Sequence, residues 1–420
     1  MHSQPNVNKV LACHGIEKQP MLETQEYLKK IECLRREFTG RSAAVRSYRK
    51  VADQLELNSM EFASANLHYL LRHIPMDAHP GIIDAIFLNR ECSDLDEDCF
   101  FLLDSTEIID PNSALISAKD KPVIFCTFHY GSYRLINPLL VSRSFNYILP
   151  VEDKIYAEQK TRFLEGCIKC QTHFNSTSQF MVVNAEQPTA ALSMARKTRS
   201  GWSLLAYIDG NTGVQGAELD NSKMLRIPLL GKAIYARRGI TFLSHFLKLP
   251  IVPVICEITG PMGRCLTFHD RIDPSDYPDN REDYCRMATE RLYSVLGDYL
   301  EKSPSQWLGW LDMQKYIDMD NISESETGVA QSADVVSLVD QNADKRIVFN
   351  HQRFGFIVND EQRVLLDKVT YKLLSIPDGI AEILETYRQP KKLSASAPTS
   401  EYREVIEQLV SLEMLSIVAT

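Results

Sequence analysis

The sequence predicts an α/β protein with a mostly parallel sheet and flanking helices, a helical segment before it, and a small winged-helix-like α+β domain after it. Two patterns support this prediction. From residue 121 onwards, short apolar runs alternate with helix-like segments, which is the pattern of βαβ units. Before residue 95, apolar residues recur at spacings of three and four, as they do in amphipathic helices.

The alternating region defines the expected sheet and its crossover helices. Strands are predicted over residues 122–127, 147–151, 204–208, 251–258 and 264–268. Helices are predicted over residues 154–167, 188–198 and 233–247, with a closing helix over 283–301. A helix between two strands returns the chain to the same end of the sheet, so neighbouring strands in such a sheet are parallel.

Composition divides the chain into five parts. We expect a loose N-terminus over residues 1–20, a helical segment over 21–118 and the α/β domain over 119–317. An acidic Ser-rich linker should follow over residues 318–343, and a C-terminal domain over 344–420. In the last part we predict a hairpin of two strands, over residues 346–350 and 354–359. Three short helices are predicted over residues 362–374, 379–387 and 400–412, and a final strand over 414–418.

The composition restricts the class of protein and its location. The chain has 420 residues, of which 44% are hydrophobic and 24% charged, as is typical of soluble globular proteins. No apolar run approaches the roughly 18–20 residues that a bilayer-spanning helix needs, and the N-terminal residues lack the layout of a signal peptide. We therefore expect a cytoplasmic protein without a transmembrane segment. The net charge of −9 argues against nucleic acid as a partner.

The cysteines give little sign of a metal site. Several of the ten lie in apolar runs, where a free thiol behaves as a small hydrophobic side chain. Cys167 and Cys170, followed by His173, have the spacing of half a zinc site. Because no second cysteine pair is placed to complete a tetrahedral site, we predict no bound metal.

The stretch over residues 121–140 carries the first candidate for chemistry. His129 follows the apolar run 122–127, at the exit of a predicted strand and just before a predicted helix. In open α/β sheets this edge forms a crevice with helix N-termini at its floor. His129 could act there as a general base, Gly131 would let a ligand approach the backbone, and amides at the helix start could hold an oxyanion. The alternative is that His129 only caps the turn.

A second turn follows a second predicted strand. Residues 204–208 run into Asp209, Gly210 and Asn211. A type I turn explains this sequence without any function. Two polar turns at matching ends of one sheet nevertheless favour a site, in which Asp209 orients a catalytic group or binds substrate, and Gly210 and Asn211 contact substrate.

Basic residues are concentrated around the second turn. Residues 190–240 contain eight basic and three acidic side chains, a local balance of +5 in a chain whose net charge is −9. Arg226 and Lys232, together with Arg134, are therefore candidate contacts for an anionic substrate. An acyl carrier protein or a coenzyme A ester has that charge.

The order of these features resembles a known family. Residues 121–316 resemble the lipid A lauroyl/myristoyl acyltransferases, a branch of the lysophospholipid acyltransferase-like superfamily, in five motifs: Thr127-Phe-His-Tyr-Gly131, Tyr207-Ile-Asp-Gly-Asn211, Arg226-Ile-Pro-Leu-Leu-Gly-Lys232, Leu249-Pro-Ile-Val-Pro-Val254 and Gln306-Trp-Leu-Gly-Trp310. The resemblance implies acyl transfer from an acyl carrier protein or acyl-CoA thioester, with His129 as general base and no bound cofactor.

One residue departs from the family pattern. The family has an Asp or Glu five residues after the histidine, and here that position is Arg134. An arginine cannot accept the imidazole N–H, so another acid must orient His129. The candidates are Asp209, Glu152 and Asp153. The alternatives are a non-catalytic scaffold that binds a peptide and a carrier protein, and a lipid-directed lysophospholipid acyltransferase, which the missing N-terminal membrane helix of that family disfavours.

The C-terminal domain resembles a second family. Its predicted hairpin and Leu-rich helices, over residues 344–418, resemble the peptide-binding domain typified by the pyrroloquinoline quinone synthesis protein D. This implies that residues 345–359 bind the leader of a ribosomally made peptide as an added strand. The acyl acceptor would then be an amine or hydroxyl of that peptide. The alternative is a winged-helix module for packing or dimerisation.

Overall fold

A computed structural model describes residues 10–39, 54–210, 223–277, 280–319, 346–359, 362–392 and 400–418. The chain forms two compact units, which are described separately. The first comprises Met1–Ser47 and Ile82–Gly309, and the second comprises Tyr48–Gly81 and Trp310–Thr420. Asp318 and Met319 are the only described residues of the predicted linker, and the rest of it lies outside the described ranges.

The first unit contains a seven-stranded sheet, which confirms the predicted α/β class. Its strand order is β1-β9-β8-β2-β5-β3-β4, and all neighbours pair in parallel except β8 and β9. The strands are β1 (Glu107–Ile109), β2 (Ile124–Thr127), β3 (Tyr147–Val151), β4 (Phe180–Asn184), β5 (Ser203–Tyr207), β8 (Ile251–Ile258) and β9 (Arg264–Phe268). The five predicted strands are all present, and β1 and β4 are additional.

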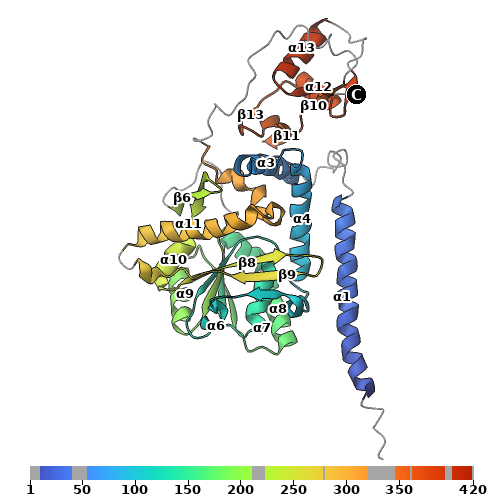
Figure 1. Ribbon diagram of the computed structural model, residues 1–420. Helices are drawn as coiled ribbons and strands as arrows, with labels where there is room; N and C mark the ends of the chain where they lie inside the picture. The colour runs from blue at the N-terminus through green and yellow to red at the C-terminus, as the bar shows by residue number, and fades with distance from the viewer. Residues whose placement is uncertain are drawn as a thin grey trace, which may run out of the picture. The chain divides into compact units, whose positions relative to one another are not determined.

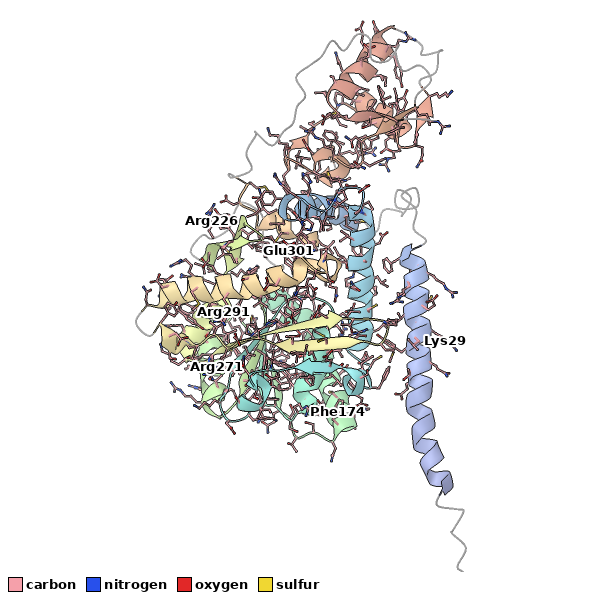
Figure 2. The ribbon with its side chains drawn as sticks, viewed as in Figure 1. Lys29, Phe174, Arg226, Arg271, Arg291 and Glu301 are labelled. Atoms are coloured by element: carbon pink, nitrogen blue, oxygen red, sulfur yellow. The ribbon has the colours of Figure 1, made fainter. Side chains whose placement is uncertain are left out.

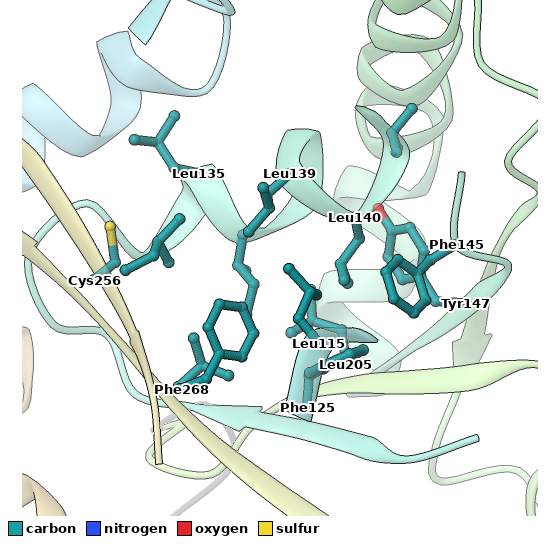
Figure 3. Packing of buried hydrophobic residues seen from close by; sticks show 14 of the residues in the cluster. Leu115, Phe125, Leu135, Leu139, Leu140, Phe145, Tyr147, Leu205, Cys256 and Phe268 are labelled. Carbon is teal, nitrogen blue, oxygen red and sulfur yellow. The ribbon is translucent and has the colours of Figure 1, made fainter. Parts of the chain in front are cut away.

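Helices cover both faces of this sheet. α7 (Ile136–Ser142) and α8 (Asp153–Phe174) lie on one face, and α9 (Ala190–Arg199), α10 (Gly239–Leu247) and α11 (Arg281–Leu300) lie on the other (Figure 1). In Figure 3, leucines of α7 pack over Phe125 of β2 and Leu205 of β5. Because both faces are covered, β2 is buried at every residue, as expected of a central parallel strand.

A hairpin replaces part of a predicted helix. The helix predicted over residues 233–247 is wrong in its first part, because β6 (Met224–Leu229) and β7 (Lys232–Arg237) pair in antiparallel fashion and α10 begins only at Gly239. Leu230 and Gly231 both have positive φ, 51° and 76°, which suits a two-residue hairpin turn. From Ala233 to Arg237, residues of β7 alternate between half-buried and buried, which is the period of a strand.

The N-terminal segment is more regular than predicted. α1 (Val10–Thr39) begins inside the segment for which no structure was expected, because a helix extends easily once one turn has formed. Tyr27 and Ile31 of α1 are buried in the core of the first unit. The other helices of this unit are α4 (His79–Asp96), α5 (Leu102–Ser105), α6 (Ala114–Ser117), η2 (Tyr133–Leu135), η5 (Pro274–Asp276), η6 (Pro304–Gln306) and η7 (Leu308–Leu311), of which α4 and η7 cross a boundary between the units.

The second unit contains two small antiparallel sheets. Their strand orders are β14-β10-β15 and β11-β12-β13. The strands are β10 (Arg346–Phe349), β11 (Phe354–Asn359), β12 (Gln362–Asp367), β13 (Leu373–Leu374), β14 (Lys391–Lys392) and β15 (Leu415–Val418). The helices are α3 (Gln54–Leu70), η8 (Met313–Lys315), α12 (Asp378–Thr386) and α13 (Ser400–Ser411).

Two sequence predictions for this unit are wrong. The helix predicted over residues 362–374 is two strands, because β12 pairs with β11 along its whole length and this pairing overrides the helical spacing of its leucines. The predicted hairpin does not form either, since β10 and β11 belong to different sheets. The predictions of α12, α13 and β15 are confirmed within one or two residues.

The sheet edges bear on the expected peptide site. β10 is the central strand of its sheet, between β14 and β15. The backbone of β11 at Val358 is already bonded by Asn58 of α3, whose side-chain amide donates to the carbonyl at 2.6 Å and accepts from the N–H at 3.0 Å. A leader peptide would therefore have to use a different strand or displace Asn58.

None of the helices in the described ranges is both long and apolar enough to cross a bilayer.

Candidate active site

The site is built where two adjacent parallel strands end. β2 and β5 pair with Thr127 opposite Tyr207, so the residues two positions further on, His129 and Asp209, are brought side by side. The imidazole Nδ1 of His129 lies 2.8 Å from Oδ1 of Asp209. Asp209 is therefore the acid that faces His129.

The carboxylate of Asp209 is held by three N–H groups. Besides the imidazole, the backbone N–H of His129 donates to both oxygens, at 3.1 and 3.0 Å, and the indole Nε1 of Trp307 donates to Oδ2 at 2.8 Å. Burial alone would raise the pKa of Asp209, but the charge of His129 and the hydrogen bonds from His129 and Trp307 hold it below its usual value. Asp209 is thus ionised at neutral pH and can only accept hydrogen bonds.

This arrangement fixes the tautomer of His129. Because the carboxylate only accepts, Nδ1 must carry the proton, and Nε2 then presents its lone pair. The side chain of His129 is 30% exposed while that of Asp209 is 4% exposed, so the imidazole can reach a substrate and the carboxylate cannot. A base with an orienting acid behind it is the minimal apparatus for activating a hydroxyl or amine.

The two other candidate acids are engaged elsewhere. Glu152 forms an ion pair with Arg237 at 2.8 Å, and Asp153 accepts a hydrogen bond from Asn184 at 2.5 Å. Both follow β3, one strand beyond β5 in the sheet.

The guanidinium of Arg134 is paired with carboxylates of its own and does not act on the imidazole of His129. Its guanidinium pairs with Asp94 at 2.7 Å and with Glu97 at 3.2 Å, both on or next to the C-terminal end of α4. The side chain is only 18% exposed, and its charge is balanced by these two carboxylates. Arg134 therefore ties the histidine turn to α4, and it is not placed as the contact for an anionic substrate that the sequence predicted.

Gly131 serves packing within the chain. Its φ is +57°, and a Cβ built on it would lie 2.0 Å from the carbonyl oxygen of Cys256 and 2.8 Å from Oε1 of Gln306. Its N–H donates to the carbonyl of Gln306 at 2.8 Å. The close backbone approach predicted for a ligand is thus made by β8 and by the segment after α11.

Replacing Gly131 with Ala should lower the free energy of unfolding by more than roughly 2 kcal/mol, because the left-handed conformation alone costs a non-glycine residue roughly 1–2 kcal/mol and the clash adds to it. Urea denaturation measures the change. Gly166→Ala on α8 is the matched control, since a Cβ there meets nothing within 4 Å. That variant should gain about 0.5–1 kcal/mol. Equal stability of Gly131→Ala and the natural protein would contradict this account.

The remaining predicted contacts lie around the site. Gly210 directly follows Asp209, and Asn211 lies outside the described residues. Arg226 is exposed on β6, where Figure 2 labels it, and Lys232 is half-buried at the start of β7. Part of the local basic excess is neutralised within the chain, because Arg238 pairs with Glu282 as Arg237 does with Glu152.

Sequence reasoning missed three aromatic residues of the site. Trp307 bonds Asp209, and the rings of Tyr133 and Tyr207 lie 4.8 and 5.1 Å from the imidazole, centroid to centroid. Leu308 N–H also donates to the carbonyl of His129 at 3.0 Å. A signal existed in the sequence, since a buried tryptophan needs an acceptor for its indole N–H.

A buried polar cluster lies beside the histidine turn. Asp96 accepts two hydrogen bonds from Arg264, at 2.6 and 3.0 Å, one from the Tyr27 hydroxyl at 2.6 Å, and one from the Ser132 hydroxyl. The side chains of Asp96 and Arg264 are 0% and 1% exposed. The cluster joins α1, α4 and β9 to Ser132, three residues after His129.

Among the described residues, no third ligand group completes the possible zinc half-site. Cys167 and Cys170 are buried on α8, and burial raises the pKa of their thiols to about 11 and about 12. Throughout the described ranges, no group of three or more His, Cys, Asp or Glu side chains is arranged to hold a metal ion.

No protein-family model matches the chain, and no curated protein matches it.

Proposed function

We propose that this protein is an acyltransferase that moves an acyl group from a thioester to an amine or hydroxyl. The observation that carries the proposal is the 2.8 Å contact between His129 and a buried, ionised Asp209 at the carboxyl edge of a parallel sheet. This pairing supplies a base with a fixed tautomer, which acyl transfer to a neutral nucleophile requires.

The steps follow from that geometry. Nε2 of His129 takes the proton of the acceptor as its oxygen or nitrogen attacks the thioester carbonyl, and Asp209 stabilises the imidazolium that forms. The tetrahedral intermediate then collapses, the C–S bond breaks, and the imidazolium returns its proton to the thiolate. No covalent enzyme intermediate is needed, because the acceptor itself attacks.

The donor and acceptor follow from the resemblances in the sequence. An acyl carrier protein or acyl-CoA is the proposed donor, and exposed Arg226 with half-buried Lys232 on the β6–β7 hairpin is the proposed contact for its phosphates. The C-terminal residues 344–420 are proposed to recruit a ribosomally made peptide that carries the acceptor group.

One observation favours catalysis over a non-catalytic scaffold. The scaffold alternative rested on Arg134 at the position of the family's acid, because a histidine without a carboxylate partner has no fixed tautomer. Asp209 occupies that role from another strand, and Arg134 is paired with Asp94 and Glu97.

The test is acyl transfer by the full-length protein and by His129→Ala. Incubation with acyl-CoA or acyl carrier protein thioesters and candidate peptides should give a mass gain of one acyl group with release of a free thiol. His129→Ala should lower the rate by about 10²–10⁴-fold. Equal turnover by the variant, or peptide binding without any acyl transfer by the natural protein, would refute the proposal.

A further inference from the structure

Acyl transfer needs a donor for the oxyanion, and three amides of the histidine turn, just before the first helical residue Tyr133, are already occupied. The N–H groups of His129, Gly131 and Ser132 donate to Asp209, to the Gln306 carbonyl at 2.8 Å and to the Cys256 carbonyl at 3.1 Å. The sequence predicted an oxyanion site made of amides at the helix start. These three amides instead hold the turn to β5, to β8 and to the segment after α11.

Tyr133 carries a side-chain donor on a ring that packs against the imidazole. It is the first residue of η2, and its ring centroid lies 4.8 Å from that of the imidazole, at an interplanar angle of 68°. Tyr133 is 6% exposed. Within the described ranges, its hydroxyl has no hydrogen-bond partner, and it is not one of the fully buried unpaired polar atoms, so the oxygen is open to a ligand.

The neighbouring tyrosines differ from Tyr133 in this respect. The Tyr207 hydroxyl accepts from Asn137 at 3.1 Å and donates to the Tyr133 carbonyl at 3.5 Å. The Tyr130 hydroxyl lies near two acceptors, the carbonyls of Tyr299 and Ser303, at 3.3 and 3.2 Å. Both hydroxyls serve the fold, whereas that of Tyr133 has no such role within the described residues.

We propose that the Tyr133 hydroxyl donates the hydrogen bond that stabilises the oxyanion of the tetrahedral intermediate formed at His129. This inference rests on the proposed acyltransferase function. As the acceptor attacks and Nε2 takes its proton, the carbonyl π electrons move onto oxygen, and the Tyr133 O–H hydrogen-bonds to that oxygen without losing its proton. When the carbonyl re-forms, the C–S bond breaks and the imidazolium protonates the departing thiolate.

The surroundings of Tyr133 suit a donor. Burial raises its pKa, so the hydroxyl stays protonated at neutral pH. The Arg134 guanidinium lies over the ring, 5.3 Å from the centroid, where its positive charge favours electron withdrawal from the phenol. A donor already fixed by packing on His129 and Tyr207 needs little reorganisation when charge develops on the substrate.

The test compares Tyr133→Phe with Tyr130→Phe, which removes a neighbouring tyrosine hydroxyl that bonds the carbonyls of Tyr299 and Ser303. The assay follows thiol release and N- or O-acylation with dodecanoyl-coenzyme A as donor and ethanolamine as acceptor. Tyr133→Phe should lower kcat by about 10²–10³-fold and change KM by less than about threefold, because the bond forms only as charge develops. Tyr130→Phe should keep kcat within about threefold, although it is less stable.

The outcomes separate this inference from the proposed function. If kcat of Tyr133→Phe stays within about threefold of the natural protein while His129→Ala is inactive, Tyr133 is not the donor and the acyltransferase proposal stands. A loss that appears mainly in KM would also overturn the assignment, since it would indicate substrate binding. If the natural protein shows no His129-dependent transfer, both proposals fail. Thermal unfolding of each variant checks that phenylalanine keeps the fold.

Discussion

Asp209→Asn should lower the rate of acyl transfer by about 10²–10⁴-fold, although the side chain keeps its size. The carboxylate accepts hydrogen bonds from three N–H groups: the backbone N–H of His129, the imidazole of His129 and the indole of Trp307. An asparagine presents one oxygen and an NH₂, which cannot accept. The imidazole then shifts its proton to Nε2, and the base is lost. Glu152→Gln is the control, because Glu152 pairs with Arg237, and its activity should stay within about threefold.

Asp209→Asn should also change how the free energy of unfolding depends on pH. Burial acts to raise the pKa of Asp209, but His129 and Trp307 outweigh it and hold the pKa below the usual value. The carboxylate therefore stabilises the fold fully above the unfolded pKa of about 3.9, and this contribution is lost as pH falls through the folded pKa. Urea unfolding should show a smaller difference between the natural protein and Asp209→Asn below about pH 3.5 than near pH 7. A pH-independent difference would contradict the lowered pKa.

Asp96→Leu should lower the free energy of unfolding by about 3–5 kcal/mol, because it leaves the guanidinium of Arg264 buried without its carboxylate. Arg264 is 1% exposed and donates to both oxygens of Asp96. The hydroxyls of Tyr27 and Ser132 would lose their acceptor as well. Urea denaturation monitored by tryptophan fluorescence measures the loss.

A surface ion pair provides the control for that measurement. Glu290 lies 4.0 Å from Arg286 on α11, and the two side chains are 36% and 57% exposed. Glu290→Gln should change stability by about 0–1 kcal/mol, because solvent screens the pair. The double variant Asp96→Leu with Arg264→Met should recover part of the loss, since two apolar side chains bury no charge. A double variant less stable than Asp96→Leu would contradict burial of Arg264 as the cause.

The strand predictions that were confirmed came from local patterns of residues along the chain. The strand-like runs 147–151, 251–258 and 264–268 define β3, β8 and β9 with the predicted bounds, because most of each run is buried and turn or polar residues flank it. Helix α10 was predicted too long, since Ala233 and Ile234 fit a helical period as well as they fit the strand β7. The leucines of β12 misled in the same way, because a few apolar residues fit either period.

The site could be located only in part from the sequence. His129 and Asp209 were both identified, because each follows an apolar run and lies at the exit of a strand. Their pairing was left open between three acids, since it depends on β5 lying next to β2, with six elements of the chain between them. Trp307 was missed as a partner of Asp209, 98 residues before it, because no local spacing reports so distant a contact.

The sequence by itself determined the α/β class, the strand ends that carry His129 and Asp209, and an arginine, Arg134, five residues after the histidine. Only the tertiary structure decided what these residues do to one another. Strand pairing brings Asp209 to the imidazole, and the carboxylates of Asp94 and Glu97 pair with Arg134 at α4. The physical reason is that charge and hydrogen bonding act over a few ångströms in space, and the order of strands in the sheet sets which residues come that close.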